Sequence, residues 1–119
     1  MTEHQEQVAV VKWFDHQYPR LRGKLFAVPN GGQRHPAVAA KLKAEGVRRG
    51  VPDLWLPVRT DCFAGLVIEL KVKGGRLSPE QADWLDHLTG EGYMAVVCVG
   101  ADAAMATISG YLSCQSLRV

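Results

Sequence analysis

Hydrophobic and polar residues alternate most regularly between residues 50 and 73, where the pattern predicts two strands joined by a short turn. The first strand is expected over 52–58, the second over 63–72, and the turn around Asp61. Side chains on successive strand residues point to opposite faces, so an antiparallel hairpin about Asp61 gathers apolar pairs on one face. These pairs are Leu54 with Ile68, Leu56 with Leu66, and Val58 with Ala64.

The opposite face of this predicted hairpin carries three charged residues. Asp53 lies directly across from Glu69, and Lys71 follows two residues later on the same side. Directly opposed Cβ atoms lie about 4.5–5.5 Å apart in an antiparallel pair. A register shifted by one residue would turn both carboxylates into the core, so the apolar pattern selects against that shift.

Two carboxylates this close repel each other unless a cation lies between them. Carboxylate oxygens without His or Cys nearby suit Mg²⁺ or Mn²⁺ better than zinc. Lys71 adds a positive charge that suits a phosphate or a water molecule at the ion. The alternative interpretation is a salt-bridged polar face on a solvent-exposed sheet, with Lys71 neutralising Glu69.

The N-terminal segment, residues 2–16, has the apolar spacing of an amphipathic helix. Thr2 is expected to cap its start, with Gln5 as the partner in a capping box. Further along the chain, the pattern predicts a strand over 24–28, a turn over 29–32, and a helix over 37–45 that Pro36 begins and Gly46 ends.

After the hairpin, Ser78, Pro79 and Gln81 form a helix start, with Ser at the N-cap, Pro at the first helical position and Gln completing a capping box. This helix is expected to end near Gly90. The apolar run over 93–99 does not alternate, which predicts a strand buried on both faces. A closing helix over 101–112 and a tail or partner contact over 113–119 complete the prediction.

A chain of 119 residues is expected to form one domain over 1–119. Its 47% hydrophobic and 22% charged residues are ordinary for a globular protein. No apolar run approaches the ~20 residues that span a bilayer, and the polar start lacks the apolar stretch of a signal peptide. We therefore expect a cytoplasmic protein without membrane association. Three widely spaced cysteines argue against a disulfide framework or a zinc site.

Charge is distributed unevenly along the chain. Residues 1–50 hold nine Lys or Arg and four acids, a net charge of +5, whereas residues 51–119 hold five and eight, a net charge of −3. Between Arg20 and Arg49 there are eight basic residues and one acid, Glu45. Such a basic region suits a polyanion held through its phosphates. A solvated basic surface is the alternative.

Pro52-Asp53 followed by Glu69-Leu70-Lys71 resembles the signature of the PD-(D/E)XK nucleases. Flanking residues narrow the resemblance to the virus-type replication-repair nuclease (VRR-NUC) group, and they occur in the same order over residues 3–99. These flanking residues are Pro29-Asn30-Gly31-Gly32 with Arg34, then Gly46 and Gly50, and finally Gly75-Arg76-Leu77-Ser78-Pro79-Glu80-Gln81.

The resemblance implies a restriction-endonuclease-like α/β core, with a mixed four-stranded sheet flanked by helices. It also implies a DNA endonuclease that uses Mg²⁺ or Mn²⁺, bound by Asp53, Glu69 and the backbone carbonyl of Leu70. One ion or two both fit this signature. A helical Glu four residues before a Gln contributes to the metal site in this group. Glu3 fits that spacing, and Glu6 is the substitute; an exposed first-turn acid is the alternative for Glu3.

In the resembled group, Lys71 orients the attacking water or stabilises the transition state, and Gln81 lies near the site. The capping box also explains Gln81, so two roles compete for one side chain. We expect basic residues to contact the DNA backbone, and the resemblance adds the loop residue Asn30 to them. The expected DNA contacts are Asn30, Arg34, Lys41, Arg48, Arg49, Lys73 and Arg76.

No helix-turn-helix or zinc module is evident, which favours recognition of DNA shape over base sequence. The small phage and bacterial proteins of the resembled group act as homodimers on branched DNA, so a homodimer and branched or junction DNA are expected here, without a nucleotide cofactor. Two alternatives remain open. One is a site-specific nicking or restriction-type endonuclease, and the other is a non-catalytic DNA-binding protein on the same fold.

Overall fold

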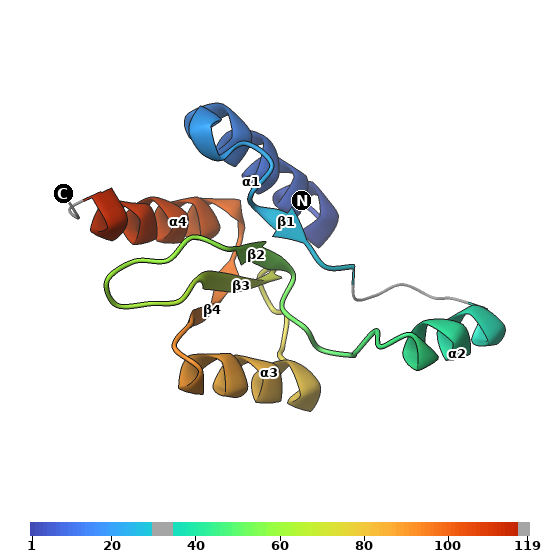
Figure 1. Ribbon diagram of the computed structural model, residues 1–119. Coiled ribbons are helices and arrows are strands. Elements are labelled where there is room, and N and C mark those ends of the chain that lie inside the picture. Colours follow the sequence, from blue (N-terminus) through green and yellow to red (C-terminus); the bar gives the residue numbers. More distant parts are fainter. Residues whose placement is uncertain (30–34, 117–119) are drawn as a thin grey trace.

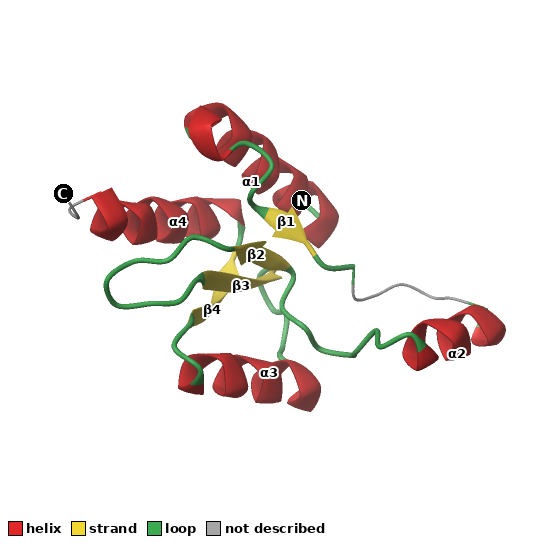
Figure 2. Ribbon diagram, in the orientation of Figure 1, coloured by secondary structure: helices red, strands yellow, loops and turns green. Residues whose placement is uncertain are grey.

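A mixed four-stranded β-sheet forms the centre of the computed structural model, which describes residues 1–29 and 35–116 (Figures 1 and 2). Within these residues the strand order is β1-β2-β3-β4. The strands are β1 (Phe26–Ala27), β2 (Leu54–Leu56), β3 (Leu66–Lys71) and β4 (Met94–Val99). β1 and β2 pair antiparallel, β2 and β3 pair antiparallel, and β3 and β4 pair parallel. The predicted fold class is confirmed.

Helices lie on both faces of this sheet. α1 (Glu3–Gln17) and α4 (Ala101–Ser116) pack against each other on one face, and α3 (Pro79–Gly90) lies on the other (Figure 1). A short 3₁₀ turn, η1 (Pro19–Leu21), follows α1. α2 (Pro36–Ala44) stands apart from these layers and has no buried residue.

The main core fills the space between the sheet and the α1–α4 layer. Strands β2 and β3 contribute alternate residues to it, as the hairpin pattern predicts. α1 adds Val10 and Phe14, and α4 adds Ala104 and Ile108, each with no exposed surface. Cys98 of β4 is buried in the same cluster, as expected of a small core residue.

The predicted hairpin register is confirmed, but the strands are shorter than predicted. Leu54 pairs with Ile68, and Leu56 pairs with Leu66. The pairing ends there, so the expected Val58–Ala64 pair is absent from the described ladder. The Ala64 N–H instead donates to the carbonyl of Gly92, which draws the chain toward the start of β4. Likewise, the strand expected over 24–28 reduces to the two residues of β1.

The prediction that the strand at 93–99 is buried on both faces is wrong. β4 is the last strand in the sheet order, and Val97 and Val99 are 40% and 56% exposed. An uninterrupted apolar sequence therefore occurs here on an edge strand, where two of its valines stay exposed. The closing helix is also longer than predicted, because α4 continues to Ser116 instead of ending at residue 112.

Helix caps follow the sequence closely. Thr2 and Gln5 form the complete capping box of α1, and Ser78 and Gln81 form that of α3. Gly46 follows α2 with φ of +100°, the left-handed conformation expected of a residue just beyond a helix end. Among the described residues, no helix has both the length and the apolar character needed to cross a membrane.

Candidate metal centre

Asp53 is held in place by the neighbouring strand. It lies one residue before β2, and its Oδ2 accepts a hydrogen bond of 2.8 Å from the backbone N–H of Leu70 in β3. The carbonyl of Asp53 also accepts a hydrogen bond from Val28 N–H, at 2.9 Å. These two bonds fix the backbone and the carboxylate of Asp53 on the face of the sheet predicted to carry the charges.

Glu69 is the most buried acid of the described chain, with only 1% of its surface exposed. Its Oε2 accepts a hydrogen bond from Nε2 of Gln81 at 3.1 Å and lies 3.6 Å from Nζ of Lys71. Its Oε1 is buried and receives no hydrogen bond from any described residue. Such an oxygen is costly to bury unless something else satisfies it. The alternative interpretation is thus right that Lys71 pairs with Glu69 and wrong that the pair is exposed to solvent, because both residues are buried.

The electrostatics of Glu69 reflect its surroundings. The pKa of its carboxyl is raised to about 8, mainly by burial and also by repulsion from Asp53 and a hydrogen bond with Asp53, while Lys71 acts in the opposite direction. Without a metal ion, Glu69 thus favours its protonated form at neutral pH. A divalent cation would favour the charged form of Glu69 instead.

Gln81 fills both of the roles that compete for it in the sequence. Its Oε1 accepts a hydrogen bond from Ser78 N–H at 2.9 Å, and its own N–H donates to Ser78 Oγ at 3.1 Å. Its Nε2 remains available and donates to Glu69. A side-chain amide has an acceptor at one atom and donors at the other, so one Gln both caps α3 and contacts the acid.

The residues around Asp53 and Glu69 fit a hard divalent cation such as Mg²⁺ or Mn²⁺. The unsatisfied Glu69 Oε1, the adjacent carboxylate of Asp53 and the raised pKa of Glu69 all describe an oxygen site that suits a cation. The side chain of Leu70 is a hydrocarbon, so its backbone carbonyl is the only oxygen it could contribute as a ligand.

The structure does not bring Glu3 or Glu6 to this pair. Among the described residues, no three His, Cys, Asp or Glu side chains lie close enough together to hold one ion. Glu3 is exposed in the first turn of α1. Glu6 is half-buried, and its Oε2 accepts a hydrogen bond of 2.7 Å from Ala101 N–H, the first residue of α4. A bond between residues 95 positions apart has no local signal in the sequence.

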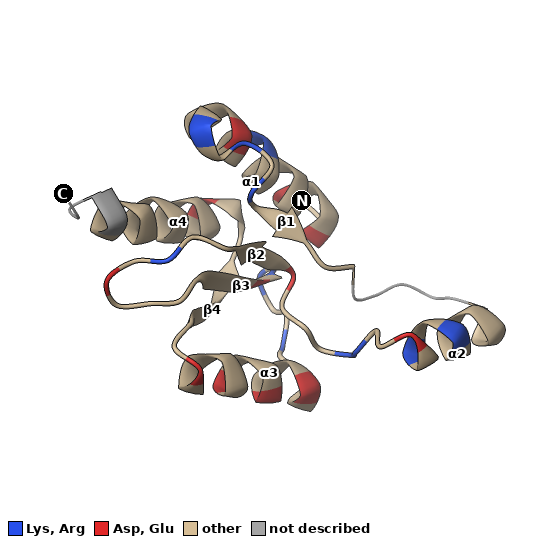
Figure 3. Cartoon of the chain, in the orientation of Figure 1, with Lys and Arg blue, Asp and Glu red and all other residues tan. Residues whose placement is uncertain are grey.

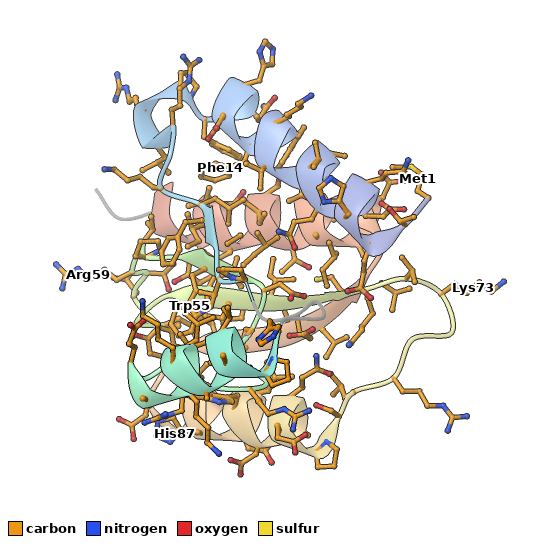
Figure 4. All side chains as sticks on the ribbon, turned by 90° about the vertical axis from the view of Figure 1, so that its right-hand side faces the viewer. Met1, Phe14, Trp55, Arg59, Lys73 and His87 are labelled. Atoms are coloured by element: carbon orange, nitrogen blue, oxygen red, sulfur yellow. The ribbon has the colours of Figure 1, made fainter. Side chains whose placement is uncertain are left out.

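The loop after β3 brings basic residues toward the same end of the sheet. A Cβ added to Gly75 would lie 3.4 Å from Cδ of Lys71, so this loop passes directly beside the lysine stem. Lys73 and Arg76 are exposed on the loop, and Figure 4 shows Lys73 on the opposite side of the molecule from Arg59. These two cations therefore lie on the loop that passes beside Lys71.

The remaining predicted DNA contacts fall on or near α2. Lys41, Arg48 and Arg49 are exposed, and basic residues follow α2 toward the sheet (Figure 3). Acidic residues lie instead along α3. The predicted turn over 29–32, including Asn30, and the predicted contact Arg34 fall outside the residues that the structure describes.

Comparison with known proteins supports the resemblance seen in the sequence. The sequence model of the VRR-NUC domain matches residues 1–102. The chain belongs to the VRR-NUC family. A solved structure titled "VRR_NUC domain protein" has a TM-score of 0.84 and 30% sequence identity, with 96% of this chain and 90% of that chain covered. No curated protein sequence matches the chain. Membership of the VRR-NUC family makes this a nuclease-type domain that processes DNA.

Proposed function

We propose that this VRR-NUC protein is a metal-dependent DNA endonuclease that hydrolyses phosphodiester bonds within a strand. The observation that carries the proposal is the buried Glu69 beside the half-buried Asp53, with one unsatisfied carboxylate oxygen on Glu69 and the ammonium of Lys71 next to it. A buried carboxylate oxygen without a hydrogen-bond partner is costly to maintain. A bound cation would satisfy this oxygen.

Asp53, Glu69 and the carbonyl of Leu70 would hold Mg²⁺ or Mn²⁺. When bound, such an ion lowers the pKa of water and offsets negative charge on the scissile phosphate. Glu3 remains a predicted ligand, although its side chain is exposed in the first turn of α1.

Each neighbouring side chain has its own role in the proposal. Lys71 donates to a phosphate oxygen or orients the attacking water, because its ammonium lies beside Glu69 in a site with little solvent. Gln81 keeps Glu69 Oε2 occupied and so leaves Oε1 directed to the ion. Lys73 and Arg76, together with Lys41, Arg48 and Arg49, contact the phosphates on either side, and Asn30 and Arg34 complete the set.

We further propose that the substrate is branched or junction DNA and that the protein acts as a homodimer. The isolated position of α2 supports a second copy: a nine-residue helix is marginal on its own, and α2 exposes 48% of Val38. A symmetric pair would also present two sites to the arms of a junction.

A cleavage assay tests the proposal. The purified protein is incubated with linear duplex, flap and four-way junction DNA, each with Mg²⁺, with Mn²⁺ or with EDTA. We expect metal-dependent strand cleavage that favours the branched substrates. Cleavage of plain duplex at one sequence would instead identify a site-specific nicking or restriction-type enzyme. Binding of DNA without cleavage under any condition would leave a DNA-binding protein on a nuclease fold.

A further inference from the structure

Gln81 reaches Glu69 only because α3 begins at one particular place beside the sheet. The N-terminal end of α3 packs against the loop that leads into β2, and the point of contact is Gly50. This contact joins two segments that the chain separates by 30 positions. It fixes the distance between the strand that carries Asp53 and the helix that carries Gln81.

The contact at Gly50 leaves no room for a side chain. A Cβ at this position would lie 2.6 Å from the carbonyl carbon of Glu80 and 2.8 Å from the backbone N of Gln81. Both neighbours are backbone atoms, which cannot rotate away as a flexible side chain would. Gly50 also has φ of +83°, a conformation that other residues adopt at a cost. Any larger residue must therefore push the first turn of α3 outward.

The capping box acts on the same side chain from within α3. The hydroxyl and N–H of Ser78 hold the backbone and Oε1 of Gln81, so the amide group retains little rotational freedom. With Oε1 fixed in this way, Nε2 points toward the sheet and donates to Glu69 at 3.1 Å.

We propose that Gly50 and Ser78 are positioning residues of the metal centre: Gly50 seats the first turn of α3 against the β2 loop, Ser78 fixes the Gln81 amide, and together they direct Nε2 onto Glu69. The consequence for ion binding rests on the function proposed above. The hydrogen bond itself does not, so the two parts can be tested separately.

Gly50→Ala is the principal variant, and Gly23→Ala is its matched control. Gly23 has φ of +81° with nothing within 4 Å of an added Cβ, so Gly23→Ala carries the same backbone strain without the contact. In EDTA, the side-chain amide of Gln81 in Gly50→Ala should show faster hydrogen exchange by NMR. Its chemical shifts should also move toward those of a glutamine side chain exposed to solvent. Gly23→Ala should leave these signals unchanged. Unchanged signals in Gly50→Ala would overturn the proposal.

Titration with Mn²⁺ then tests the consequence for the ion. Loss of a group that orients a ligand costs about 10–100-fold in metal affinity. We expect a loss in this range for Gly50→Ala and for Gln81→Ala, and no further loss when the two are combined, because Gly50 acts through Gln81. Additive losses would contradict action through Gln81. An amide signal that changes while Mn²⁺ affinity does not would reject the ion-binding role and retain the positioning role.

Ser78→Ala provides an independent arm if Gly50→Ala does not fold. It removes the hydroxyl that holds the Gln81 backbone, whereas Ser78→Thr keeps an equivalent hydroxyl. We expect Ser78→Ala to weaken Mn²⁺ binding and free the Gln81 amide, and Ser78→Thr to restore both. Equal Mn²⁺ affinities and amide signals in the two variants would overturn the role of Ser78.

Discussion

Oε2 of Glu6 accepts a hydrogen bond of 2.7 Å from the backbone N–H of Ala101 and so joins α1 to the start of α4. The preceding residue, Gly100, donates its N–H to the carbonyl of Lys71 at 2.8 Å. One carboxylate therefore connects the N-terminal helix to the strand end that carries the proposed catalytic lysine. The negative charge of Glu6 also favours the positive end of the α4 dipole.

Replacing Glu6 by Ala should destabilise the fold by about 1–2 kcal/mol, the usual cost of losing an acceptor at a helix N-terminus. Chemical denaturation measures this change. Glu3→Ala is the matched control: Glu3 is exposed on the same helix, so its loss should leave the unfolding free energy unchanged. A Glu3→Ala variant that loses Mn²⁺ affinity at full stability would establish Glu3 as a ligand after all.

In EDTA, the stability of the protein should fall as the pH rises from about 5 to 9. The pKa of Glu69 is raised to about 8 in the folded state from an ordinary value of 4.5, so the folded protein binds this proton more tightly than the unfolded chain. Its contribution to stability is complete below pH 4.5 and is lost as the pH passes through 8. Thermal denaturation across this range measures the loss.

Glu69→Gln is the control for this pH dependence, since glutamine does not titrate. The variant should show a flatter curve than the natural sequence over the same pH range, and Mn²⁺ should restore stability at pH 8 only when Glu69 is present. Parallel curves for the two proteins in EDTA would mean that Glu69 is already ionised at neutral pH.

Asp53→Asn and Lys71→Ala should each reduce strand cleavage by at least about 100-fold, because each removes a charge that the transition state requires. DNA binding, measured by fluorescence anisotropy in EDTA, should persist. Asn at position 53 can still accept a hydrogen bond from the N–H of Leu70, so the strands should remain paired. Loss of binding together with cleavage would assign both residues to the fold.

Replacing Arg48 and Arg49 by Ala should weaken binding to every DNA sequence equally. The logarithm of the binding constant falls linearly with the logarithm of the salt concentration, and each lost phosphate contact reduces the magnitude of this slope by about 0.9. The double variant should therefore reduce the magnitude of the slope by about 2. Arg59→Ala is the charge-matched control for each single variant, since Arg59 is exposed in the loop between β2 and β3, on the side of the molecule opposite α2 (Figure 1). A changed sequence preference in the double variant would assign these arginines to base contacts instead.

Local patterns predicted the parts of the fold that depend on neighbouring residues. The capping boxes at Thr2 and Ser78 were predictable because Ser or Thr and Gln three residues apart satisfy backbone groups within one turn. The hairpin register that pairs Leu54 with Ile68 was also predictable, because a shift by one residue would turn these apolar side chains out of the core.

The features that the sequence did not predict depend on contacts between distant segments. The strand over 93–99 looked buried because its residues are all apolar, yet burial is decided by its place at the sheet edge. The partner of Glu6 and the close contact of Gly50 with α3 both join segments that no periodicity relates. The two roles of Gln81 required the positions of its two amide atoms relative to Ser78 and Glu69.

The exposed valines of β4 have a consequence for the thermodynamics of binding. In the parallel ladder, Val97 pairs with Glu69 and Val99 pairs with Lys71, so these apolar side chains share a sheet face with the charged ones. A DNA strand bound at the proposed metal site would also cover these two valines. Part of the binding affinity should then persist at high salt and should come with a negative heat-capacity change, which calorimetry can separate from counterion release.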